Sequence, residues 1–192
     1  IGRNLDDMLD GLMDGAGERP KLAHRLDRDT SGVLVVARTA KMANALMKLF
    51  SGRQVDKTYW ALVNGSPLPP VGMIDLPLLK KKNPRAGAHG AGPDGRDYEV
   101  VQVDEEGQHA RTEYRVIDAL ARKLALVELK PLTGRMHQLR VHMAAIGCPV
   151  VGDHKYGGGT SDAESLGVEN ILHLHARRIV IRCGSQCDAH GA

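Results

Sequence analysis

Charged residues are concentrated in the segment HRLDRDTSG, residues 24–32, just ahead of the apolar run GVLVVA. A turn needs only Gly, Asp, Asn or Ser at its special positions, and two arginines around one aspartate exceed that need. A carboxylate buried near a guanidinium, such as Asp27 near Arg25, stays ionised at neutral pH and can act as a nucleophile. Taken alone, the segment is nevertheless better explained as a hydrogen-bonded turn that leads into a strand.

A second group of polar side chains lies in TGRMHQLRVH, residues 133–142. The first two residues of this segment are expected to begin a helix, whose free backbone amides could face an anion. Arg135 lies near that end and Arg140 follows about 1.4 turns later, so their side chains point in different directions. A solvated helix face that holds two arginines is the alternative. The further donors His137 and Gln138, in the same turn and beside an apolar stripe, favour a binding site.

Histidines and one aspartate in the C-terminal half of the chain suggest a metal site at first sight; they are His137, His142, Asp153, His154, His173 and His175. Their spacing fits no familiar zinc pattern, and the sequence has no HExxH motif. The three cysteines, Cys148, Cys183 and Cys187, are odd in number and lack a framework spacing. They argue against a disulfide scaffold and fit a reducing cytoplasm. A metal hydrolase that uses the histidines is therefore kept only as a rival hypothesis.

The length and net charge of the chain limit the classes of protein to which it can belong. A chain of 192 residues is long enough for one sizeable core. The net charge of +3 permits a nucleic-acid partner without requiring one. No apolar run approaches the roughly 18 residues of a membrane span, and no signal peptide opens the chain. Several basic residues in loops or at strand ends would suit phosphate contacts: Lys80, Lys81, Lys82, Arg85, Lys155, Arg177, Arg178 and Arg182.

Strands are expected to outnumber the helices that lie between them. The apolar and alternating runs predict strands over residues 33–38, 56–64, 110–118, 123–130 and 171–181. In the last of these, Leu172, Leu174 and Ala176 share one face. Hairpin-length links prevail over helical crossovers, so the pattern predicts an α+β fold with a mostly antiparallel sheet.

Three helices and two long loops complete the expected organisation. A short helix is expected within residues 5–12, and a second begins after a Thr39 cap, with Met42, Leu46, Leu49 and Phe50 on one face. The third covers residues 132–147, with Leu139, Met143 and Ile146 on one side. Residues 77–97 are expected to form a long mobile loop, and residues 157–170 form a second loop.

Four segments in order resemble the RluA-type pseudouridine synthases: HRLDRDTSG, KTYWALVNG (57–65), LTGRMHQLRVHMAAIGCPVVGDHKYG (132–157) and LHLHA (172–176). The resemblance covers the chain from Leu22 to about Ile181. It implies a single α+β catalytic domain over residues 1–192, with a mixed, largely antiparallel sheet, flanking helices and an RNA-binding cleft. The first strand and the N-terminal S4 domain of many members are missing, and the chain begins with Ile1. We therefore expect a trimmed core of a longer protein.

The resemblance also implies the reaction and the residues that perform it. A uridine in RNA is flipped out and its glycosidic bond is broken; the uracil then turns, and C5 joins the ribose C1′, without a cofactor or metal. The family's catalytic aspartate falls on Asp27, its tyrosine on Tyr59 and its paired arginine most plausibly on Arg140. The expected substrate-binding residues are His24, Arg25, Thr30, Arg135, His137, Gln138, Leu172 and Leu174. Of these, Arg25 is expected to fill the gap left by the flipped base, and Leu172 is weakly preferred over Leu174 for the uracil pocket.

The expected substrate is large-subunit ribosomal RNA, with transfer RNA or mitochondrial RNA as alternatives. A non-catalytic RNA-binding domain of the same fold is a further alternative, although a pure binder has no use for an ionised carboxylate in its RNA cleft. Attack by Asp27 at C1′, attack at C6 and a glycal route all remain open. The protein is expected to be a cytoplasmic monomer, and Asp29 to Gly32 are expected to build the bend that presents Asp27.

Overall fold

The computed structural model describes residues 5–13, 17–52, 54–82, 99–157, 163 and 165–182. These residues form two compact units. The first combines Ile1–Lys57 with Ala176–Ala192, and the second is Thr58–His175. The division falls within strands β4 (Val55–Asn64) and β10 (Leu174–Ile181), so each of these strands contributes residues to both units. No helix in the described part of the chain is long and apolar enough to cross a membrane.

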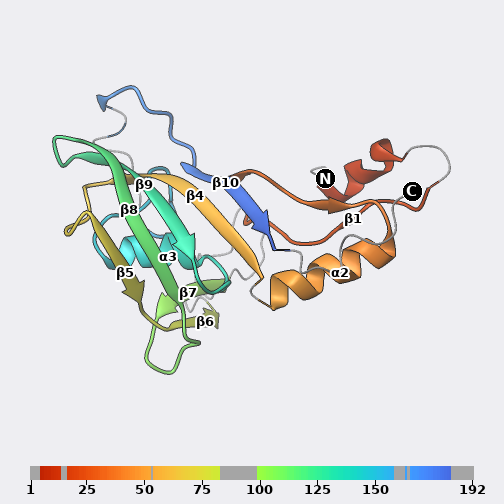
Figure 1. The fold of residues 1–192 in the computed structure, drawn as a ribbon. Coiled ribbons are helices and arrows are strands. Elements are labelled where there is room, and N and C mark those ends of the chain that lie inside the picture. Colours follow the sequence, from red (N-terminus) through yellow and green to blue (C-terminus); the bar gives the residue numbers. More distant parts are fainter. Residues whose placement is uncertain are drawn as a thin grey trace. The chain divides into compact units, whose positions relative to one another are not determined.

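The second unit is built on an antiparallel sheet in which β4 is followed by β9 (Leu124–Pro131), β8 (Arg111–Leu120) and β5 (Val71–Asp75) (Figure 1). One row across this sheet is Tyr59, Leu129, Tyr114 and Gly72, each paired with the next. The strands 110–118 and 123–130 predicted from alternation are thereby confirmed as β8 and β9, and β4 ends at Asn64 as predicted.

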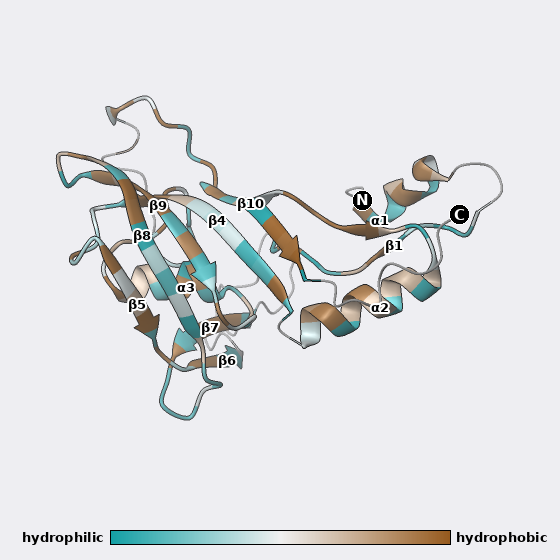
Figure 2. Cartoon of the chain, viewed as in Figure 1, coloured by the Kyte–Doolittle hydropathy of each residue, from teal (hydrophilic) through white to brown (hydrophobic). Residues whose placement is uncertain are grey.

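The core of the second unit lies between this sheet and helix α3 (Gln138–Ala145), which is drawn against one face of the sheet in Figure 1. Alternate residues of β9, namely Ala125, Val127 and Leu129, face this core. The first four residues of β9 are all apolar, and hydrophobic and hydrophilic residues alternate only in its second half (Figure 2). The helix contributes Leu139 and Met143, as the apolar spacing predicted. The central residues of the core are fully buried: Val63, Val127, Leu129, Met143 and Val150.

A separate two-stranded ribbon, β6 (Leu78–Lys82) with β7 (Glu99–Val103), lies beside the same helix. Leu78 and Val101 pack there against Val141 of α3. The prediction of a loop over residues 77–97 is therefore wrong for its first part, because Leu78 and Leu79 open a strand whose partner lies beyond the loop. Residues 83–98 lie outside the described residues.

The first unit holds the short N-terminal helices, α2 and several short strands. Helix α1 (Leu5–Met8) continues as a 3-10 helix (Leu9–Leu12), as expected for residues 5–12. Helix α2 (Ala40–Ser51) begins after Thr39, whose side chain accepts a hydrogen bond from the Met42 amide at 3.2 Å, which confirms the predicted cap. Ala43 and Leu46 are the buried residues of α2, whereas Met42, expected on the same apolar face, is exposed.

The continuous strand predicted over residues 33–38 is wrong. Within the segment only β3 (Val36–Ala37) is a strand, and it pairs with β1 (Lys21–Leu22). The short strand β2 (Ser31–Gly32) ends just before the segment; Gly32 adopts φ 114°, and a Cβ there would lie 2.3 Å from the carbonyl oxygen of Ala176. Beyond Gly32, the Val35 amide donates to His24 Nε2 at 2.9 Å instead of to a neighbouring strand, so the apolar run does not form one strand.

Candidate active site

Arg140 on helix α3 forms a buried ion pair with Asp153. Its Nε and Nη2 atoms each donate to one carboxylate oxygen at 2.7 Å, so the contact is bidentate. Side-chain exposure is only 10% for Arg140 and 0% for Asp153, so both charges are removed from water. A buried guanidinium of this kind requires such a partner, because an unpaired buried charge is costly.

The backbone around Asp153 completes the hydrogen bonding of its carboxylate. Oδ1 also accepts from the amides of Lys155 and Tyr156, at 3.1 and 3.2 Å. Gly152, with φ 72°, directs the chain into this turn, and a Cβ at Gly152 would lie 1.8 Å from the carbonyl oxygen of Ile171. Only glycine fits there without rearrangement. Asp153 was a metal candidate in the sequence, and no group of three suitable ligands occurs among the described residues.

Tyr156 lies between Arg140 and His137. The guanidinium carbon of Arg140 is 5.1 Å from the centre of the Tyr156 ring, within the range of a cation–π contact. The Tyr156 hydroxyl is 2.7 Å from His137 Nδ1 and accepts from the amide of Val101 at 3.2 Å. Arg140, His137 and Tyr156 are therefore brought together in the second unit.

The residues before α3 form a turn rather than the first turn of the helix, so the prediction that the helix begins at Thr133 is wrong. His137 adopts a left-handed φ of 52°, which interrupts helical geometry, and α3 begins at Gln138. The Gln138 side chain folds back, and its Oε1 accepts from Thr133 Oγ1 at 2.7 Å and from the Arg135 amide at 3.0 Å. The helix-start anion site expected at residues 133–134 is therefore not formed.

Gln138 belongs to a buried polar network and is itself only 3% exposed. Its Nε2 donates to the Arg111 carbonyl and to Thr112 Oγ1. Thr112 in turn contacts His142 Nδ1 at 2.9 Å, and His142 Nε2 lies 3.0 Å from the Leu76 carbonyl. Since a carbonyl can only accept, Nε2 carries the proton and Nδ1 accepts from Thr112. Burial lowers the pKa of His142, so the neutral ring fits this network.

Arg135 is connected to the same turn but points elsewhere. Its Nε donates to the His109 carbonyl at 3.1 Å, which lies outside the Arg140 cluster. The sequence prediction that Arg135 and Arg140 point in different directions is consistent with these separate partners.

Tyr59, Leu172 and Leu174 pack on one hydrophobic cluster of the second unit. Leu174 is fully inside this cluster at 4% exposure, whereas Tyr59 and Leu172 are half-buried at its edge. A residue that lines a substrate pocket must keep some accessible surface, so this difference favours Leu172 over Leu174 for the predicted uracil contact.

Asp27 lies in the first unit, in a turn closed by a hydrogen bond from the Thr30 amide to the Asp27 carbonyl at 3.1 Å. Asp29 takes the left-handed conformation of this turn, with φ 67°. The Asp27 side chain is half-buried, and Arg25 is exposed. Thr30 Oγ1 is buried and has no hydrogen-bond partner among the described residues. The predicted pairing of Asp27 with Arg140 stays a prediction.

The His24 ring is fixed by contacts with residues of the first unit. Its ring stacks on Phe50 with centroids 4.4 Å apart, and its Nε2 accepts from the Val35 amide at 2.9 Å. Burial lowers the pKa of His24, and the neighbouring Lys57 charge lowers it further. Lys57, whose own pKa is lowered by burial, was not singled out in the sequence, because a lone lysine beside a strand carries no distinguishing pattern.

Several basic residues expected to contact phosphate have partners within the protein. Lys80 contacts Glu99 and Lys81 contacts Asp104, both at 2.6 Å, and Lys155 donates to the Glu99 carbonyl. In the first unit Arg182 pairs with Asp56, whereas Arg177 and Arg178 are exposed. Arg85, Cys183 and Cys187 lie outside the described residues, as does much of the loop expected over 157–170.

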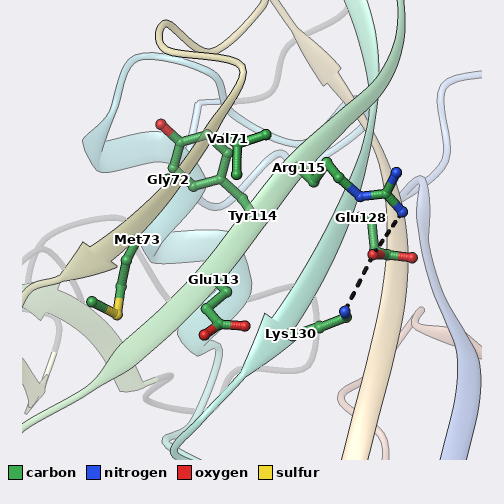
Figure 3. Close-up of a pocket in the computed structure, with 8 residues that line it drawn as sticks. All are labelled: Val71, Gly72, Met73, Glu113, Tyr114, Arg115, Glu128 and Lys130. Carbon is green, nitrogen blue, oxygen red and sulfur yellow. Dashed lines mark hydrogen bonds and ion pairs between the residues drawn. The ribbon is translucent and has the colours of Figure 1, made fainter.

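The outer face of the second unit's sheet carries a groove of about 430 Å³ (Figure 3). Arg115 and Lys130 point toward Glu128 there, with N–O distances of 3.0 and 3.6 Å. The lining residues are Val71, Gly72, Met73, Glu113, Tyr114, Arg115, Glu128 and Lys130. None of the site residues predicted from the sequence lines this groove, so it is separate from the candidate site.

Asp153 and Tyr156 are the site residues that sequence reasoning missed. Both lie in GDHKYG, at the end of the third segment that carried the family resemblance. A glycine that must adopt a positive φ, followed directly by an acid, is the signal that could have identified the turn. The pairing partner 13 residues upstream is not visible in the sequence.

Comparison with known proteins identifies the family. The family model described as RNA pseudouridylate synthase matches residues 7–145. A Zymomonas mobilis protein described as an uncharacterized RNA pseudouridine synthase is 40% identical over 177 residues, which are 92% of this chain and 74% of that protein. Ribosomal large subunit pseudouridine synthase C of Rickettsia typhi is 35% identical over 162 residues, 84% of this chain and 48% of its own length.

The solved structure of human RNA pseudouridylate synthase domain containing 4 has a TM-score of 0.71 and 33% identity, and the match covers 92% of this chain and 72% of that one. The chain therefore spans between about half and three quarters of the length of these relatives. These matches confirm the predicted α+β pseudouridine synthase fold and the resemblance noted in the sequence. The chain belongs to the RNA pseudouridylate synthase family.

Proposed function

We propose that this protein isomerises specific uridines in RNA to pseudouridine, with Asp27, Tyr59 and Arg140 as its catalytic residues. The observation that carries the proposal is the coincidence of the family match with a buried, bidentately held arginine at the position of the family's arginine motif.

The reaction is an isomerisation in which atoms and electrons balance within the nucleoside. The bond between uracil N1 and ribose C1′ breaks, and a bond between C5 and C1′ forms. The proton at C5 leaves and a proton is gained on the former N1, so no oxidant or reductant is needed. Ionised Asp27 attacks C1′ or C6 or assists a glycal route, and Tyr59 packs on the uracil and takes the C5 proton.

Arg140 is proposed to pair with Asp27 and keep it ionised. Asp153 engages one N–H on Nε and one on Nη2, so the guanidinium is held in a fixed position. The predicted RNA contacts include Arg25 in the space left by the flipped base, which offsets part of the few kcal/mol of unstacking.

Large-subunit ribosomal RNA is the proposed substrate. The proposal is supported by the similarity to a relative whose name assigns it to the large ribosomal subunit. Transfer RNA and mitochondrial RNA are the alternatives, and we further propose a monomer that acts in the cytoplasm. Light scattering on the purified protein tests the oligomeric state, and a dimer would contradict it.

Primer-extension mapping of pseudouridine in cells that lack the protein tests both reaction and substrate. We expect one or a few large-subunit sites to become unmodified, and the wild-type gene to restore them. Loss confined to transfer RNA would overturn the ribosomal assignment and leave the reaction intact. Unchanged modification in all RNAs would contradict the proposed function and favour the RNA-binding alternative.

A further inference from the structure

Asp153 is a buried acid that the chemistry of uridine isomerisation does not itself require. Its carboxylate accepts four hydrogen bonds: two from Arg140 and two from the Lys155 and Tyr156 amides. All four donors are local to one turn and one helix of the second unit. The arrangement therefore serves to fix the Arg140 guanidinium in one place.

Tyr156 restrains the same guanidinium from its face. The ring lies 5.1 Å from the guanidinium carbon, and the ring itself is anchored at its hydroxyl by the Val101 amide and by His137. Arg140 is thus held along its Nε–Nη2 edge by Asp153 and on one face by Tyr156. A long arginine side chain otherwise has many rotamers, and these contacts remove most of that freedom.

We propose that Asp153 and Tyr156 are positioning residues that act through Arg140, holding its guanidinium in the orientation that the reaction needs. The proposal rests on the proposed function, because it assigns the geometry to Arg140's part in catalysis. Asp153 and Tyr156 touch neither substrate nor reacting atoms in this account. Removing them changes the chemical step and leaves RNA affinity intact.

The test compares Asp153→Asn with Asp118→Asn in the full-length protein. Asp118 is an exposed aspartate of β8 whose carboxylate accepts a hydrogen bond from the Ala119 amide, so it serves as the matched control. Asparagine at 153 keeps the shape but places an amide donor against one of the Arg140 N–H groups. We expect the single-turnover rate to fall about 10²-fold, as small misplacements of catalytic groups do, with the Kd for RNA unchanged.

A double-mutant cycle separates positioning from stability. If Asp153 acts through Arg140, Asp153→Asn causes little further loss in an Arg140→Lys background, because the group it positions is already replaced. Rate losses that multiply would overturn the proposal. Rates are measured well below the melting temperature of each variant, so partial unfolding does not contribute. Should Asp153→Asn fail to fold, Tyr156→Leu replaces it, with a loss of about tenfold expected.

An NMR measurement tests the positioning without relying on activity. The Nε proton of Arg140 should exchange slowly with water in the wild type and rapidly in Asp153→Asn. Equal exchange in both proteins would overturn the proposal. A wild type that forms no pseudouridine would refute the proposed function, whereas an active wild type with fully active Asp153→Asn would refute the positioning alone.

Discussion

Replacing Gln138 with leucine tests how much the buried polar network contributes to stability. The Gln138 amide makes four hydrogen bonds, to Thr133, the Arg135 amide, the Arg111 carbonyl and Thr112. Leucine fits a similar volume but satisfies none of them.

Three of these four groups retain another partner in the variant. Thr133 Oγ1 still accepts from the Arg111 amide, and Thr112 Oγ1 still contacts His142. The Arg111 carbonyl still accepts from the Leu132 amide at 2.9 Å. The Arg135 amide loses the hydrogen bond it makes to Gln138. At about 1–3 kcal/mol for an unsatisfied group, we expect the free energy of unfolding to fall by about 1–3 kcal/mol. For a chain of this length the melting temperature then falls by roughly 2–12 °C.

Urea denaturation followed by circular dichroism measures this change. The control is Gln102→Leu, because Gln102 is exposed and its side chain donates an exposed hydrogen bond to Asp104. We expect a loss below about 0.5 kcal/mol for the control. A loss for Gln138→Leu no larger than that of the control would refute the reasoning, because it would mean that water or a small shift satisfies the Arg135 amide.

Three further substitutions test other parts of the account. Gly152→Ala should lower the free energy of unfolding, measured by urea denaturation, by about 3 kcal/mol or more, because its Cβ would meet the Ile171 carbonyl at 1.8 Å. The control Gly157→Ala, also at positive φ but with open space around it, should lower it by about 1–2 kcal/mol. Equal losses in the two variants would contradict the close approach at Gly152. Burial lowers the pKa of His142 below 6.5, so only the unfolded state takes up its proton as the pH falls from that value, and the free energy of unfolding falls with pH. His142→Gln should show a shallower fall between neutral pH and pH about 5 in thermal melts, and parallel curves would count against this assignment. Thr39→Ala should lower the free energy of unfolding by about 1 kcal/mol through loss of the α2 cap, whereas no change would show that the cap bond is not needed.

The sequence predicted an element well where a residue at its end caps or stops the backbone locally. The Thr39 cap and the Asn64–Gly65 stop marked the ends of α2 and β4, because both signals act on the neighbouring backbone alone. The strands β8 and β9 followed from alternation, since one face of each is buried in the same core.

Tertiary contacts decided where sequence reasoning failed. The start of α3 depends on the Gln138 amide, which bonds back to Thr133 only because β8 supplies the Arg111 carbonyl and Thr112 on its other side. The break in residues 33–38 involves the Val35 amide, which donates to the His24 side chain instead of to a neighbouring strand. Neither contact has a signature in the local pattern of residue types.

The sequence pointed to Arg140 as a residue of the candidate site but not to the side chain that pairs with it. The segment 132–157 pointed to Arg140 through the family resemblance, while the buried partner Asp153 was considered only as a metal ligand. The structure places both Asp153 oxygens on the Arg140 guanidinium, and the positioning role proposed for Asp153 rests on that contact. The four N–H donors of the Asp153 carboxylate explain why this acid is buried, and the sequence does not show that they meet there.

The most direct test of the central claim is tritium release from RNA labelled at uracil C5, comparing the full-length protein with Asp27→Asn. Asp29→Asn is the matched control, because Asp29 is an exposed carboxylate of the same turn. The account predicts release by the wild type and by Asp29→Asn and none by Asp27→Asn, with RNA still bound by all three. Equal release from the wild type and Asp27→Asn would contradict the role of Asp27, and no release from the wild type on ribosomal or transfer RNA would contradict the proposed reaction.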